Sequence, residues 1–181
     1  VAAYELKGQR QRKEEGWNAH QYHAESEFYS DFGTYEVSIT VPKDYKVAAT
    51  GRITRQPEER QAGWWTHNFW AQDVHDFAWA ASPHFVHFSR DYNDLGERGI
   101  TVQLYLDPAH QEQAERYFDV VYRTMKNFGE WFGPYPYDTL SVVVPPPGAS
   151  GAGGMEYPTL ITSWDASVPE QGLAIEQVVI H

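Results

Sequence analysis

The chain has 181 residues, of which 41% are hydrophobic and 22% are charged, so it can bury a core and is not a disordered tail. Its 14 Lys and Arg residues stand against 25 Asp and Glu residues. With the resulting net charge of −11, we expect a poor nucleic-acid binder, because phosphate contacts need clustered Lys and Arg. The absence of Cys excludes disulfides and Cys-ligated metals, and no apolar run is long enough to span a membrane.

The first half of the chain has the pattern of short strands. Residues 35–41 alternate apolar and polar side chains with a period of two, which predicts a half-buried strand. Aromatic residues make up 15% of the chain and favour strands and large aromatic cores. Further strands are predicted at 46–50, 64–71, 74–81 and 85–89. Strands at this spacing indicate an antiparallel sheet or sandwich.

The pattern changes near residue 92 and becomes mixed. Asp107 and Pro108 suit the N-cap and first residue of a helix, and apolar residues three and four apart predict that this helix continues to Phe132. Pro158 cannot donate to a strand ladder, so it favours an edge strand around itself. The other predicted elements are a strand at 100–106, a buried strand at 140–144, that edge strand at 155–162 and an apolar helix from Ser167 to His181.

Most of the chain carries little sign of catalytic chemistry. Three pairs among its eight histidines have separations typical of metal ligands: His20 with His23, His67 with His75, and His84 with His87. No carboxylate lies at a spacing that would complete a three-ligand set, so we expect no metal site from these pairs. The sequence also lacks a Gly-x-Ser-x-Gly nucleophile turn and a phosphate-binding loop.

The informative stretch is Gly153-Gly154-Met155-Glu156-Tyr157-Pro158, which is followed by His181 after the apolar run Val178-Val179-Ile180. Here the sequence resembles the zinc aminopeptidases of the aminopeptidase N type, which are gluzincins with a thermolysin-like catalytic domain. Their signature is a Gly-x-Met-Glu-Asn segment, a gap of this size, and His-Glu-x-x-His on an apolar helix. In this chain His181 takes the place of the first histidine.

Three earlier segments extend the resemblance over about residues 28–181. They are Asp31 to Pro42 with Val47 to Gly51, then Asp73 to Trp79, and then Trp131-Phe132-Gly133-Pro134-Tyr135-Pro136-Tyr137. The resemblance implies a mixed fold in two parts. Residues 1–91 would end an N-terminal antiparallel β-sandwich domain, and residues 92–181 would form the α+β first part of a truncated thermolysin-like peptidase domain.

The resemblance also implies a function for the parent protein, a zinc metallopeptidase that hydrolyses peptide bonds and releases N-terminal residues. Glu156 matches the carboxylate that anchors the free α-amine of the peptide substrate. Gly153, Gly154, Met155 and Tyr157 match substrate-binding positions beside it, where glycine lets the backbone approach a peptide. His181 matches the first ligand of the zinc ion that polarises the scissile carbonyl.

The other zinc ligands and the general base would then lie beyond His181. A catalytic zinc needs three protein ligands, so we expect this fragment alone to be inactive and to hold no zinc. The first residue is Val1 rather than Met, which also favours a piece of a longer protein. The compartment is unknown from the sequence, and export is favoured because peptide-scavenging relatives are commonly exported.

Two departures from the family pattern keep alternatives open. Tyr157 stands where the family has Asn, and the Gln-bearing segment that anchors substrate from the sandwich domain has no clear match. One alternative is an aromatic-rich binding module that uses exposed Trp64, Trp65 and Trp70. The other is a relative that has lost activity and serves as a scaffold.

Overall fold

The computed structural model describes residues 4–8, 13–17, 30–149, 154–164 and 174–181. The chain divides into two compact units, Val1–Phe32 and Gly33–His181. In the first unit, β1 (Tyr4–Glu5) pairs antiparallel with β2 (Gly16–Trp17). The second unit contains the other described strands and the described helices, and it holds the candidate site.

Two antiparallel sheets begin the second unit. β3 (Gly33–Pro42), β6 (Trp64–Val74) and β5 (Arg52–Gln61) form a three-stranded sheet in the order β3-β6-β5, and β4 (Lys46–Ala49) pairs with β7 (Trp79–Ser82). The alternation in β3 turns Ile39 and Val41 into a core shared with Val47, Ala49 and Phe69. The predicted antiparallel region is therefore confirmed.

A five-stranded mixed sheet follows. Its order is β11 (Met155–Tyr157), β12 (Leu160–Thr162), β10 (Thr139–Val143), β9 (Ile100–Leu106) and β8 (Val86–Tyr92). β10 runs parallel to both β9 and β12, while the two outer pairs are antiparallel. β8 thus joins a sheet made otherwise of later residues, and the division at residues 91 and 92 stays a prediction.

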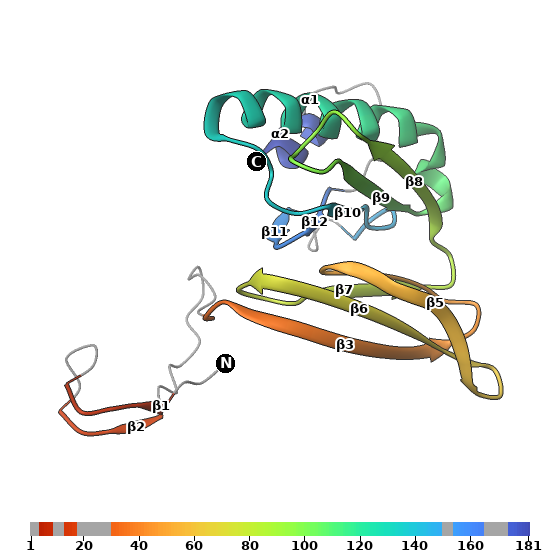
Figure 1. Ribbon diagram of the computed structural model, residues 1–181. Helices are drawn as coiled ribbons and strands as arrows, with labels where there is room; N and C mark the ends of the chain where they lie inside the picture. The colour runs from red at the N-terminus through yellow and green to blue at the C-terminus, as the bar shows by residue number, and fades with distance from the viewer. Residues whose placement is uncertain (1–3, 9–12, 18–29, 150–153, 165–173) are drawn as a thin grey trace. The chain divides into compact units, whose positions relative to one another are not determined.

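The predicted long helix is present, but its first six residues differ. Pro108–Gln113 form the 3-10 helix η2, and α1 runs from Ala114 to Phe132. Asp107 caps the start as expected, since its Oδ1 accepts a hydrogen bond from the Ala109 N–H at 3.0 Å. Gly133 ends α1 with φ of 105°. α1 lies across one face of the five-stranded sheet (Figure 1).

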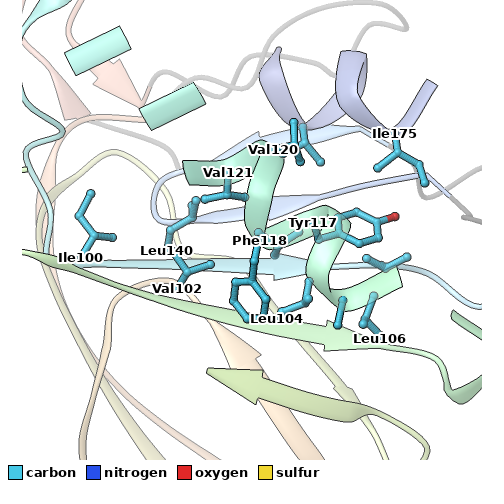
Figure 2. Close-up of a cluster of buried hydrophobic side chains, with 14 of the residues drawn as sticks. Ile100, Val102, Leu104, Leu106, Tyr117, Phe118, Val120, Val121, Leu140 and Ile175 are labelled. Atoms are coloured by element: carbon cyan, nitrogen blue, oxygen red, sulfur yellow. The ribbon is translucent and has the colours of Figure 1, made fainter. Parts of the chain in front are cut away.

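The core under α1 explains why these elements stay together. The even-numbered residues of β9 point to one face, where they meet Tyr117, Phe118 and Val121 of α1 and Leu140 of β10 (Figure 2). The short helix α2 (Ala174–Ile180) adds Ile175 and Val179 to the same cluster. The opposite face carries Tyr105 and Val143, which contact Ala48 of β4, so the five-stranded sheet is covered on both sides.

The prediction of a single edge strand at 155–162 is wrong. The segment forms a hairpin of β11 and β12, with Glu156 opposite Ile161 and Tyr157 opposite Leu160. Pro158 and Thr159 make the turn, where the missing N–H of proline interrupts no ladder. The edge position was expected correctly, because β11 is the outermost strand of its sheet. Among the described residues, no helix is long and apolar enough to cross a membrane.

Candidate functional site

A cleft of about 940 Å³ lies between the C-terminal ends of α1 and α2 and the β11–β12 hairpin. Gly154, Met155, Glu156, Tyr157 and His181 all line it, so it brings together the sequence-predicted site residues that the structure describes. Gly153 lies outside the described residues. The corner at 133–137, which belongs to one of the segments that carry the family resemblance, also lines the cleft.

Glu156 lies in the middle of β11, with its backbone opposite Ile161 and its side chain exposed. Among the described residues, no side-chain hydrogen bond or ion pair engages its carboxylate. The outer side of β11 has no neighbouring strand within the described part of the sheet. The position thus combines a carboxylate available to a ligand with backbone groups that an extended peptide can pair with.

Glycine is favoured at position 154 by its backbone conformation. Its φ of +66° is unfavourable for residues with a side chain, and a Cβ there would lie 3.5 Å from Val178 Cγ1 and 3.7 Å from the Trp164 indole nitrogen. The sequence predicts that this glycine lets a peptide backbone approach. The structure shows that Gly154 lies near α2 at the start of β11, with room for a Cβ at ordinary contact distance.

His181 follows α2 directly, and its N–H donates to the Gln177 carbonyl at 3.1 Å, which continues the helical pattern. The imidazole is exposed at the rim of the cleft. Within the described ranges, no three His, Asp or Glu side chains come together as a group that could hold a metal ion. Among the described residues, His181 therefore has no set of partner ligands at the cleft.

The apolar residues at the C-terminal end of α1 are exposed rather than packed in the core. Phe132 is 80% exposed and Trp131 is 66% exposed. Their rings form a small cluster with Phe128, with centroid separations between 5.6 and 6.2 Å. Phe128 and Phe132 line the cleft, so its α1 wall is aromatic. The apolar periodicity extends two turns beyond the part of the helix that the five-stranded sheet covers.

Comparisons with protein-family models and curated proteins identify no family for the chain. No protein-family model matches it, and no curated protein matches it significantly. The likeness to zinc aminopeptidases therefore rests on the residues of the cleft and on the segments quoted above.

The hairpin is anchored by a residue that sequence reasoning missed. Thr159 is buried in the turn, and its Oγ1 accepts a hydrogen bond from the Gly51 N–H at 2.7 Å. Its carbonyl accepts a second bond from the Ser141 N–H at 2.8 Å. The sequence signal was weak, because a threonine after proline in a turn has no special pattern. Its partner Gly51 lies 108 positions earlier, and only the fold brings it near.

The corner at 133–137, which also lines the cleft, is held in a similar way. The Tyr137 hydroxyl donates to the Asp73 carbonyl at 2.8 Å, and the Tyr135 hydroxyl donates to the Thr139 carbonyl at 3.3 Å. Burial raises the pKa of Tyr135, so its phenol stays protonated and able to donate. Both bonds fix the path of the chain between α1 and β10.

The tryptophans of the binding-module alternative do not form one platform. Trp64, Trp65 and Trp70 all lie on β6, where successive side chains point to opposite faces. Trp65 therefore faces away from the other two. Trp70 lies six residues along from Trp64 and stacks under the Arg52 guanidinium, at 4.8 Å from its ring centroid. A sugar or peptide would not meet these three rings together.

Two of the remaining histidines, His67 and His87, pack within the sheets. His87 stacks on Tyr105 with ring centroids 4.6 Å apart, and its Nε2 lies 2.6 Å from Gln103 Oε1. Tyr105 is itself buried, which raises its pKa to about 12. His67 lies half-buried on β6 opposite Ile39. His20 and His23 lie outside the described residues.

Proposed function

We propose that the chain is part of a zinc metallopeptidase of the aminopeptidase N type, which releases N-terminal residues from peptides. The observation that carries the proposal is the cleft, because it collects Gly154 to Tyr157 and His181 from two segments 25 residues apart. The combination of Gly-x-Met-Glu with a histidine after an apolar run is recognisable from the sequence alone. The fold adds support because both parts of this pattern line the same cleft.

Glu156 suits the recognition of a free N-terminus. A peptide's α-ammonium is cationic, and a carboxylate binds it by charge-assisted hydrogen bonds that strengthen when water is excluded. β11 is an edge strand, so a substrate backbone can add to the sheet beside it. In this arrangement the edge strand sets the direction of the peptide, and Glu156 stops it at its amino end.

The metal part of the proposal depends on residues other than those described. At the cleft, the described chain offers one histidine, and a catalytic zinc site needs three protein ligands. The residues present therefore do not fit a complete zinc site. The proposal requires the full-length protein to supply the remaining ligands, with Glu-x-x-His directly after His181.

The test is a substrate pair assayed with the full-length protein. One peptide has a free N-terminus, and its twin is N-acetylated. We expect hydrolysis of the free peptide, loss of activity with a zinc chelator, and recovery on adding zinc. Equal hydrolysis of both peptides would instead indicate an endopeptidase. A folded protein with no activity and no Glu-x-x-His after His181 would favour the scaffold alternative.

A further inference from the structure

The turn between β11 and β12 has an unusual backbone. Thr159 has φ of +58°, a left-handed conformation that β-branched residues rarely adopt, and it is only 4% exposed. A strained residue of this kind persists when its surroundings hold it in place. The contacts of Thr159 therefore indicate which part of the structure holds this backbone conformation.

The contact that holds Thr159 is built from both sides. The Gly51 N–H donates to Thr159 Oγ1 at 2.7 Å in a buried bond between the β4–β5 turn and the hairpin. Gly51 has φ of +84°, and a Cβ at that position would lie 2.3 Å from the Trp70 carbonyl oxygen. No side chain fits there, so the backbone of residue 51 can reach the threonine hydroxyl only because it is glycine.

The same residue ties the hairpin to its own sheet. The Thr159 carbonyl accepts from the Ser141 N–H at 2.8 Å, so one residue links the turn to β10 and to the β4–β5 turn. β11 has only three residues, and its one partner strand in the described sheet is β12. The turn therefore tethers the strand that carries Glu156 to two neighbouring parts of the fold.

We propose that Thr159 is a positioning residue for Glu156. The hydrogen bond from the Gly51 N–H to the Thr159 hydroxyl fixes the position and direction of β11 at the cleft. The proposal rests on the amine-anchor role given to Glu156 above. The β4–β5 turn would then affect substrate binding indirectly, through its hydrogen bond to Thr159 and without contacting the substrate.

The first experiment measures the tether directly in the 181-residue chain. Thr159→Val keeps the size and the β-branch but removes the acceptor, while Thr159→Ser keeps the acceptor. Thr159→Gly removes both the acceptor and the backbone strain. We expect faster amide hydrogen exchange at Gly51 and through β11 and β12 in the Val and Gly variants, with near wild-type exchange in the Ser variant. Wild-type exchange in the Gly variant would overturn the proposal.

The second experiment separates positioning from stability in the full-length protein. For a peptide with a free N-terminus, we expect Thr159→Val to raise KM about tenfold while kcat changes by less than about twofold, because a displaced anchor weakens binding of the substrate in its ground state. Thr159→Ser should restore KM. An unchanged KM in the Val variant would overturn the proposal.

Thr66→Val is the matched control. Thr66 is buried, and its hydroxyl forms a 2.9 Å bond with Thr40 within the three-stranded sheet, away from the cleft. Its loss should lower stability and leave KM unchanged; a similar rise in KM would reduce Thr159 to a general stabiliser. Should the full-length protein cleave no peptide, the aminopeptidase proposal fails, and the exchange experiment alone decides whether Thr159 positions β11.

Discussion

At the scale of single residues, Glu156 and His67 show opposite uses of a polar group. Glu156 is exposed on the edge strand, and its carboxylate has no described side-chain partner. His67 has a buried Nε2 without a hydrogen-bond partner among the described residues. The first arrangement leaves a charge available for a ligand, whereas the second opposes formation of a charge.

Glu156→Gln keeps the side-chain shape but removes the charge. Loss of one partner of a desolvated ammonium–carboxylate pair costs about 2–4 kcal/mol. We expect kcat/KM of the full-length protein to fall about 30- to 1000-fold for a free N-terminus, at 1.4 kcal/mol per factor of ten. Steady-state kinetics on the free and N-acetylated peptides measures this loss, which should be small for the blocked peptide.

Glu130→Gln is the control for that experiment, since Glu130 is an exposed carboxylate on α1 that does not line the cleft. It should leave both substrates unaffected. If Glu156→Gln leaves both equally active, the amine-anchor role is wrong. If both fall together, Glu156 acts on the strand or on the transition state instead.

His67 predicts a dependence of stability on pH. Burial lowers the pKa of His67 below its ordinary value of 6.5, so the folded chain resists a proton that the unfolded chain accepts. The free energy of unfolding should therefore fall as the pH drops from about 6.5 to the pKa of His67 in the folded chain. Above about pH 6.5, His67 is neutral in both states and makes no contribution to this dependence. Urea unfolding at a series of pH values measures the slope, which should be shallower in His67→Gln. Equal slopes for the two proteins would contradict this assignment.

At the scale of elements, α2 depends on its neighbours. Its described part has seven residues, too few for a helix to be stable alone in water. Arg116 of α1 holds it through a two-point ion pair with Glu176, with nitrogen–oxygen distances of 2.6 and 2.8 Å and both side chains 26% exposed. Ile175 and Val179 supply the apolar part of the contact.

Glu176→Gln should therefore loosen α2 specifically. We expect a loss of about 1 kcal/mol in the free energy of unfolding, since a partly buried two-point pair is worth more than an exposed one. Amide exchange should accelerate in α2 more than in α1. Asp119→Asn is the comparison, because it removes an exposed pair with Arg123 within α1 and should have a smaller effect. Equal effects of the two changes would show that the Arg116 pair contributes no special stability.

The elements that sequence predicts best are those with a clear period. The alternation in β3 and β9 and the apolar spacing in α1 each correspond to a buried face, so these elements are confirmed. β5 was missed because it is an exposed edge strand with Pro57 and five charged residues, and it has no apolar period. The hairpin at 155–162 was merged into one strand because a two-residue turn leaves only a proline as its sign.

The candidate site was predictable only as a set of residue types. The Gly-x-Met-Glu segment and His181 were recognisable from local sequence, and the fold places them at one cleft. The supporting contacts were not predictable, because Thr159 with Gly51 and Tyr137 with Asp73 each join positions 64 or more residues apart. No local pattern encodes such a pair.

At the scale of the whole molecule, the distribution of histidines predicts weak metal binding. The described histidines lie on β6 and β8, in η2, in two connections between strands and directly after α2, and no three ligand side chains meet among the residues that the structure describes. We expect the 181-residue chain to bind zinc weakly, if at all, in calorimetric titration at neutral pH. A one-to-one site of sub-micromolar affinity would show that a ligand set has been missed.

The bond between Gly51 and Thr159 has a consequence for folding. It joins positions 108 residues apart, whereas a short loop joins β8 to β9 and one crossover through α1 joins β9 to β10. A contact that closes so long a loop costs more conformational entropy and forms later on the folding pathway. The hairpin at the cleft would then be among the last parts to form, and substitutions such as Thr159→Val should speed unfolding while leaving the folding rate almost unchanged.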